Sequence, residues 1–170
     1  MKWFALGAAV FITGTAVLFV SLFAFYPIKY KTEIREAAAL YSVDKVLVAG
    51  IINAESGFKK DAVSAKGAVG LMQIMPPTAD YIAAQTGWGE GFDLRDPRTN
   101  IMFGTYYLRY LLDKFGDTKT ALIAYNAGEG NVTRWLADAR VAVLTTSPYK
   151  ETNAYVDKVL NSRSFYRFRV

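Results

Sequence analysis

Apolar residues recur every three or four positions along most of the chain beyond residue 30, which is the spacing of one face of an α-helix. In the first of these stripes Ile34, Ala37, Leu40 and Tyr41 face inward. No convincing alternation of apolar and polar residues marks a strand, although residues 141–144 have the composition of an extended segment. The stripes predict helices at residues 34–41, 46–58, 78–86, 97–115, 118–125, 131–139 and 151–160.

Caps and glycines mark several helix ends. Asp96 followed by Pro97 is a strong start signal, and the helix that it opens stops at Gly116. Asp117 caps the next helix, and Gly87 closes the helix at residues 78–86. The residues of the 97–115 helix predicted to face inward are Ile101, Leu108, Leu111, Leu112 and Phe115.

Residues 59–77 carry no helical stripe and are rich in glycine and small side chains. We predict that these residues form a loop packed against the domain rather than a flexible linker. With no repeat and no low-complexity tract elsewhere, the expected fold class is all-α, a compact domain of several short to medium helices.

One residue in the stripe of residues 46–58 is out of place. Val48, Ile51 and Ile52 form its apolar face, and Glu55 continues that face where another hydrophobe is expected. Asp44 can cap the start of this helix, and its end falls close to Glu55. Burial and the negative end of the helix dipole would both raise the pKa of this carboxyl, which a general acid near neutral pH requires. The alternative is a frayed helix end with the carboxylate in solvent.

Composition restricts the chemistry of the 170-residue chain, because it contains neither cysteine nor histidine. Disulfides, Cys/His zinc sites, cysteine nucleophiles and Ser-His-Asp arrangements are excluded. Acid–base chemistry therefore falls mainly to carboxylates, and we expect no metal and no cofactor. The length suits one domain with a sizeable core and a short extra segment.

The chain is basic, with a formal net charge of +5 and a pI near 9.3. This balance suits anionic surroundings such as phospholipid headgroups or acidic cell-wall polymers. No basic run with interleaved aromatic residues occurs in the middle of the chain, so nucleic acid is not expected as a partner.

From Trp3 to residue 26 the sequence has no charged side chain, and this length can span a bilayer as a helix. A cleaved signal peptide is the competing interpretation, because Lys2 provides a short basic start. The run is long for such a peptide and ends without a small-x-small cleavage pattern, which favours an uncleaved single-pass anchor. We therefore divide the chain into an anchor at residues 1–28 and a catalytic domain at residues 29–170.

The orientation of this anchor is ambiguous from charge alone. More basic residues follow the run than precede it, which taken simply would place the domain in the cytoplasm. A short N-terminal tail before a long folded domain can override that bias, so the orientation depends on the function.

Three further stretches combine amides and phenols. Gln73 lies in an apolar loop, Tyr125 and Asn126 lie near a helix end, and Tyr155 lies on a helix face. Singly, each is explained by core packing or helix capping. Together they provide two amides and two phenols, the groups that orient a neutral, hydroxyl-rich ligand around one acid.

These stretches, in this order and spacing, resemble the catalytic domain of the soluble-lytic-transglycosylase type, which is similar in fold to goose-type lysozyme. The resemblance covers about residues 30–160, with Glu129 standing where the family often has proline. The motifs that carry it are Glu55-Ser56-Gly57, Gly70-Leu71-Met72-Gln73-Ile74-Met75-Pro76, Ala124-Tyr125-Asn126-Ala127-Gly128, and Glu151-Thr152 with Tyr155.

The resemblance implies a lysozyme-like fold and cleavage of the β-1,4 bond between N-acetylmuramic acid and N-acetylglucosamine in peptidoglycan, with 1,6-anhydromuramyl ends as product. Most glycosidases use two carboxylates, whereas the motifs supply a second acid only at their margins. The family's mechanism uses one carboxyl, here Glu55, as acid and then base. A substrate in the cell wall would place the domain outside the cytoplasm.

The resemblance also assigns roles to the other motif residues. Tyr155 would orient the Glu55 carboxyl. Apolar groove walls would come from Met72 and Tyr125. Sugar hydroxyls, acetamido groups or the peptide stem would be bound by Ser56, Gln73 and Asn126.

Three alternatives remain open. A muramidase of the same fold would add water at the same bond, with Asp61 the first further carboxylate to test. The second alternative is a membrane-anchored glycan-binding protein that has lost catalysis, and the intact pair of Glu55 and Tyr155 argues against it. The third alternative is a membrane-tethered helical bundle that only mediates protein contacts, and the presence of four motifs in the family's order argues against it.

Overall fold

The computed structural model describes residues 26–89 and 91–170, and every regular element in these ranges is helical apart from isolated bridges. This confirms the predicted all-α class. Residues 1–25 of the predicted anchor at residues 1–28 lie outside the described residues. No helix in the described ranges has the length and apolar character needed to cross a membrane. The helices are α2 (Lys31–Leu40), α3 (Lys45–Glu55), α4 (Pro76–Thr86), α5 (Pro97–Phe115), α6 (Thr118–Ala127), α7 (Glu129–Ala139) and α8 (Lys150–Tyr166).

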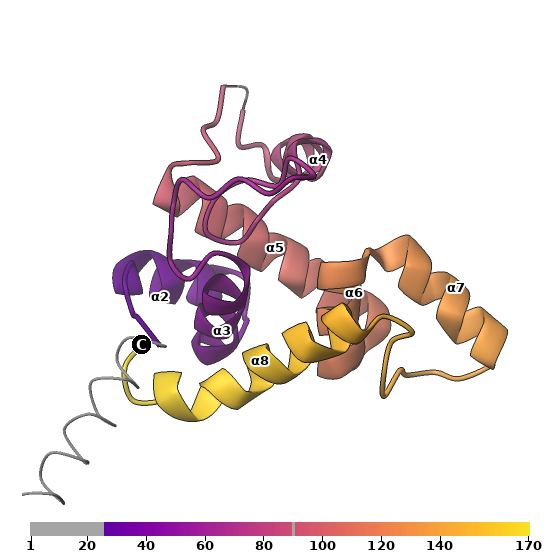
Figure 1. Cartoon of the computed structure of the whole chain (residues 1–170). Helices are drawn as coiled ribbons and strands as arrows, with labels where there is room; N and C mark the ends of the chain where they lie inside the picture. The colour runs from indigo at the N-terminus through magenta and orange to yellow at the C-terminus, as the bar shows by residue number, and fades with distance from the viewer. Residues whose placement is uncertain (1–25, 90) are drawn as a thin grey trace, which may run out of the picture.

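Helix α3 is the centre of the domain. It packs most extensively on α8 and also contacts α2, and all its residues from Val46 to Asn53 are buried. Helix α5 joins the two sides of the molecule, because it contacts α2 and α4 on one side and α6 on the other (Figure 1). Each large aliphatic side chain buried in this core contributes about 1.5–3 kcal/mol through its removal from water.

The predicted helix caps are present. The side chains of Asp44, Asp96 and Asp117 accept hydrogen bonds from backbone N–H groups in the first turns of α3, α5 and α6. Gly87 and Gly116 adopt left-handed conformations at the ends of α4 and α5, as their positions in the sequence predict. Local signals therefore determine these boundaries.

Other boundaries differ from the prediction. Helix α4 begins at Pro76, because the two prolines occupy its first turn, where a missing N–H costs nothing. Helix α8 extends to Tyr166, whose buried ring packs against Tyr26 and Phe58. In α2, Leu40 is 63% exposed rather than inward, and Ala38 is buried in the core. Residues 141–144, which had the composition of an extended segment, are irregular.

The predicted packed loop before α4 is organised by one buried side chain, Asn100 of α5. Its Oδ1 accepts a hydrogen bond from Met72 N at 2.7 Å, and its Nδ2 donates to Val69 O and Leu94 O at 2.9 Å each. Gly70 passes so close that a Cβ there would lie 2.2 Å from Asn100 Nδ2, and its φ is +83°. Only glycine fits this position, so the loop is held in one conformation beside α3.

Candidate active site

Glu55 is the last residue of α3, where it leaves the core and reaches the wall of a cavity. Burial raises the pKa of its carboxyl to about 7, while the nearby Tyr155 hydroxyl and Lys158 ammonium partly oppose this rise. The expected raised pKa is therefore present, and desolvation is its main cause. The alternative of a frayed end with Glu55 fully in solvent is wrong. At neutral pH the carboxyl can both give and accept a proton.

Two phenols accompany this carboxyl, the buried Tyr155 and the half-buried Tyr125. Tyr125 donates a hydrogen bond from its hydroxyl to Met72 O at 3.0 Å. The Tyr155 hydroxyl is buried and makes no hydrogen bond of normal geometry within the described part of the chain. It is still close enough to Glu55 to lower the pKa of that carboxyl. Burial and the Glu55 charge raise the pKa of both phenols well above its usual value, so both remain protonated donors.

The cavity beside Glu55 has a volume of about 690 Å³ and is lined by residues from six segments of the chain. Four of the predicted site residues line it, namely Glu55, Gln73, Tyr125 and Asn126. The remaining lining residues are Ser64, Ala65, Lys66, Ala68, Met75, Ala127, Asn131, Tyr149, Glu151 and Thr152. The structure thus brings together residues that are up to 97 positions apart, from Glu55 to Thr152.

The two amides on the wall present complementary groups. Gln73 Nε2 donates to Ala62 O at 3.1 Å and to Gly70 O at 2.9 Å, which fixes the amide orientation and leaves Oε1 as an acceptor. Asn126 Oδ1 accepts a hydrogen bond from Thr152 at 2.9 Å, which leaves its NH₂ group as a donor. A ligand with both hydroxyl and amide groups could bond to both.

Ser56 and Met72 do not line the cavity but support it. The Ser56 hydroxyl lies 2.8 Å from Leu71 O and 3.1 Å from Ile52 O, so it ties the end of α3 to the loop. Met72 is fully buried. Its side chain fills the space over Gly104, where a Cβ would lie 2.4 Å from its sulfur.

The other carboxylates considered for the chemistry differ in their position relative to the cavity. Asp61 pairs with Lys60 on the surface and does not line the cavity. Glu129 pairs with Lys114 at 3.3 Å and does not line the cavity either. Glu151 is the second carboxylate on the cavity wall. Within the described ranges no group of three or more acidic residues is arranged to hold a metal ion.

Several residues of the site carry no signal in the sequence. Ser64, Lys66, Asn131 and Tyr149 are common surface residues that reach the wall only through folding. Asn100 could have been noticed, because an amide inside an otherwise apolar helical stripe needs a buried partner.

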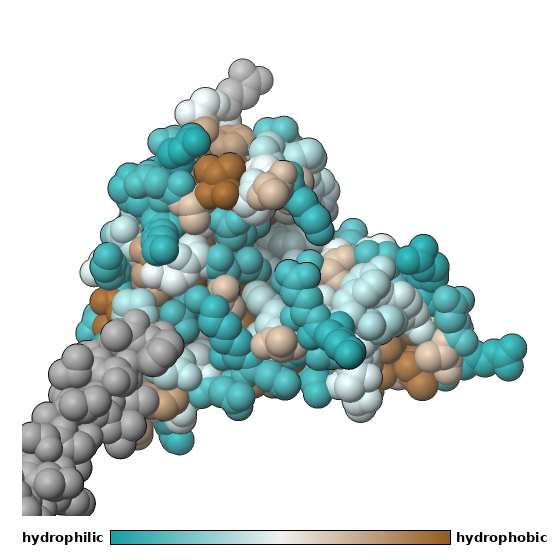
Figure 2. Space-filling model, viewed as in Figure 1, coloured by the Kyte–Doolittle hydropathy of each residue, from teal (hydrophilic) through white to brown (hydrophobic). Residues whose placement is uncertain are grey.

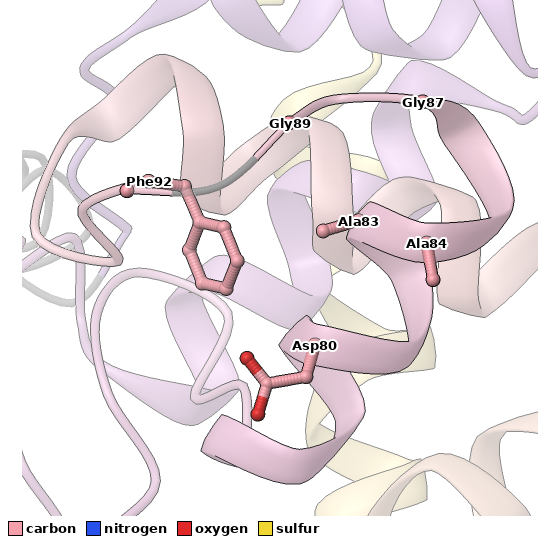
Figure 3. Close-up of a pocket in the computed structure, with 7 residues that line it drawn as sticks. Asp80, Ala83, Ala84, Gly87, Gly89 and Phe92 are labelled. Atoms are coloured by element: carbon pink, nitrogen blue, oxygen red, sulfur yellow. The ribbon is translucent and has the colours of Figure 1, made fainter.

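A second cavity, of about 620 Å³, lies away from Glu55 (Figure 3). Asp80, Ala83 and Ala84 of α4 form one side, and Gly89 and Phe92 of the following segment form another. Asp80 is the one titratable group among its described lining residues, so it lacks the cluster of functional groups found beside Glu55. The face shown in Figure 2 is mostly hydrophilic, with small separate apolar areas.

The all-helical domain, with the Glu55 carboxyl on the wall of a cavity, fits the class of lysozyme-like domains. The family model of the Transglycosylase SLT domain matches residues 32–142 of the chain. The protein belongs to this family, as the motifs around Glu55, Gln73 and Asn126 indicated.

Comparisons with individual relatives agree with this family assignment. The chain is 34% identical over 152 residues to the soluble lytic murein transglycosylase of Escherichia coli K12, covering 84% of this chain and 24% of that protein. It is 31% identical over 169 residues to the membrane-bound lytic murein transglycosylase C of Serratia proteamaculans, covering 83% and 47%. The crystal structure of the 70 kDa soluble lytic transglycosylase of E. coli matches with a TM-score of 0.78 and 32% identity, over 89% of this chain and 26% of that chain. The chain thus spans about a quarter to a half of the length of these relatives.

Proposed function

We propose that this protein is a peptidoglycan lytic transglycosylase that cleaves the β-1,4 bond between N-acetylmuramic acid and N-acetylglucosamine. The main observation in support is the Glu55 carboxyl, whose pKa of about 7 suits one group that acts as acid and then as base. Two of its relatives are named as lytic murein transglycosylases.

The reaction balances with one carboxyl. Protonated Glu55 gives its proton to the glycosidic oxygen as the bond to C1 breaks, and the substrate's N-acetyl group stabilises the cation that develops there. Glu55, now a carboxylate, accepts the proton of the C6 hydroxyl as that oxygen attacks C1. The products are a 1,6-anhydromuramyl end and a free 4-hydroxyl, and Glu55 returns to its protonated form without consuming water.

The residues around Glu55 would support these proton transfers. Tyr155 provides a protonated hydroxyl to the Glu55 carboxylate once the proton has left. Gln73 and Asn126 offer one acceptor and one donor to sugar hydroxyls and acetamido groups, and the Tyr125 ring forms a wall of the groove. Ser56 and Met72 contribute by holding the loop rather than by touching the glycan.

A muramidase that adds water is the second candidate, because Glu151 lies on the same cavity wall. Mass analysis of digested peptidoglycan separates the two reactions. A transglycosylase releases muropeptides roughly 18 mass units lighter than hydrolysis products, since no water is added. Reducing ends in place of anhydro ends would reject the transglycosylase, and a Glu151→Gln variant that lost the hydrolytic product would then identify the water-activating base.

The same proposal includes a location. Residues 3–26 would anchor the chain in the membrane by a single pass, with the domain outside the cytoplasm, where peptidoglycan lies. The relative named as membrane-bound supports the association with a membrane. Protease added to cells stripped of their wall should remove the domain, and protection of the domain would reject the orientation.

A further inference from the structure

The beginning and the end of the described chain lie side by side (Figure 1). The rings of Tyr26 and Phe165 stack with centroids 4.0 Å apart. The Tyr166 hydroxyl donates to Pro27 O at 3.0 Å, and Arg169 donates to Tyr26 O at 2.7 Å. Residues 26–31 and 163–170 therefore form one continuous surface, called here the terminal surface.

The terminal surface is strongly basic. Its two segments contain no acidic side chain, and their basic residues are Lys29, Lys31, Arg163, Arg167 and Arg169. Arg163 is paired with Asp44 at 3.0 Å. In the part of the chain that the structure describes, Lys29, Lys31 and Arg167 take part in no ion pair. The nearest acid in the sequence is Glu33, so an excess of positive charge remains.

An exposed aromatic ring lies within this basic surface. Phe168 is 88% exposed, more than any other large apolar residue described, and the Arg167 guanidinium lies 5.8 Å from its ring centroid. A single exposed apolar side chain needs no explanation by itself. Its position among cations is informative, because aromatic and basic residues together are typical of segments at the headgroup level of a bilayer.

The sequence that precedes Tyr26 gives a reason for a membrane here. Residues 3–25 have no charged side chain, and this inference rests on the proposed entry of that run into the bilayer. Lys31 is then within six residues of the bilayer boundary. Residues 163–170 are held at the same boundary by their contacts with Tyr26 and Pro27.

We propose that the terminal surface docks on the anionic headgroups of the bilayer, with Phe168 at the interface and Lys29, Lys31 and Arg167 near the lipid phosphates. Positive side chains next to a membrane-spanning segment are attracted to anionic lipids in this way. Helix α8 runs from this surface to Thr152 on the cavity wall, about 20 Å at 1.5 Å per residue. Docking would thus keep the cavity at a set distance from the membrane.

The absence of cysteine allows one reporter to be attached at a chosen site on the full chain. Phe168→Cys, labelled with an environment-sensitive fluorophore, is reconstituted into phosphatidylcholine vesicles with or without phosphatidylglycerol, and quenching by spin-labelled lipid is measured. The matched control is Val143→Cys, an exposed apolar position between α7 and α8. Both variants should cleave glycan in detergent at the wild-type rate, which shows that they fold.

We expect quenching at position 168 to be several times that at position 143, to fall in vesicles without anionic lipid, and to fall when Lys29, Lys31 and Arg167 are replaced by glutamine. Equal quenching at the two positions, in a chain that sediments with the vesicles, would overturn the docking while leaving the anchor intact. A chain that fails to sediment would reject the anchor itself. Shielding of the label by purified peptidoglycan but not by vesicles would make this a wall-binding surface and overturn the proposal.

Discussion

Glu55 combines a position at the end of a buried helix with access to a cavity. Burial raises its pKa to about 7, so both protonation states are populated at neutral pH. This single residue can therefore serve both halves of a reaction.

Replacing Glu55 by glutamine keeps the shape of the side chain but removes the transferable proton. Turnover of peptidoglycan should fall by about a hundred- to ten-thousandfold, the usual loss for a general acid, while glycan binding survives. For the wild-type enzyme, kcat/KM should decline as pH rises through about 7, where Glu55 loses its proton. Full activity of the glutamine variant would remove Glu55 from the chemistry.

The same substitution should change stability with pH. The folded pKa of Glu55 lies above its ordinary value of 4.5, so between pH 4.5 and about 7 the folded state holds a proton that the unfolded state has lost. The wild-type free energy of unfolding therefore decreases as pH rises through this window. Relative to wild type, Glu55→Gln should gain on the order of 1–3 kcal/mol between pH 4 and pH 8. Denaturant unfolding at both pH values tests this, and a constant difference would contradict it.

Tyr155→Phe removes the buried hydroxyl beside Glu55 and keeps the ring. Loss of the hydrogen bond that we propose this hydroxyl donates to the Glu55 carboxylate during the reaction should slow turnover by about ten- to a hundredfold, or 1–3 kcal/mol in the transition state. Because this hydroxyl lowers the pKa of Glu55, the alkaline limb of the pH–rate profile should move to higher pH. Tyr106→Phe, whose ring contacts Tyr41, is the control. An unchanged rate and profile would leave Tyr155 as core packing alone.

At the scale of elements, the loop between α3 and α4 determines where Gln73 lies. The loop is held by Asn100, and Gly70 makes the close approach possible. Backbone conformation and steric contact both require glycine at position 70, whereas Gly67 has a similar positive φ and open space around it. Comparing substitutions at these two glycines therefore separates the cost of backbone strain from the cost of a steric clash.

Gly67→Ala should lower the free energy of unfolding by about 1 kcal/mol, because a positive φ is unfavourable for alanine. Gly70→Ala carries the same strain and also places its Cβ 2.2 Å from Asn100 Nδ2 and 2.4 Å from Leu94 O. We expect a loss of at least 2–3 kcal/mol in the free energy of unfolding, roughly the strain plus the cost of overpacking. Equal losses in the two variants, measured by urea unfolding, would show that the loop can move aside.

On the scale of the whole molecule, the contact between α3 and α8 brings Glu55 next to Tyr155. The two helices approach closely at Gly50, where a Cβ would lie 2.7 Å from Ser162 Oγ and 3.1 Å from Val159 O. The same helix α8 places Thr152 at the cavity and Tyr166 at the opposite end of the domain. One helix pair thus links the site to the terminal surface.

Gly50→Ala should force these helices apart. Alanine gains about 1 kcal/mol of helix propensity over glycine, but overpacking costs about 1–3 kcal/mol, so we expect a net loss in thermal stability together with reduced turnover. Adding Ser162→Ala removes the nearest atom and should restore part of the stability. A single variant more stable than wild type would show that α8 shifts without cost.

Much of the fold was predictable because its signals are local. Helical spacing, the caps at Asp44, Asp96 and Asp117, and the glycines that end α4 and α5 act within a few residues. Glu55 was identifiable because a carboxyl interrupts an apolar stripe. The exposure of Leu40 and the end of α8 were not predictable, since long-range packing decides which of several neighbouring residues becomes buried.

The sequence by itself therefore determined the helices, the acid and the set of motif residues, because each depends on residue type and spacing along the chain. Only the tertiary structure decided which motif residues reach the cavity. It turned Ser56 and Met72 inward as supports, left the Gln73 and Asn126 amides facing the cavity, and placed Glu151 on its wall. It also set the desolvation that gives Glu55 its pKa, because burial is the combined effect of segments far apart in the chain.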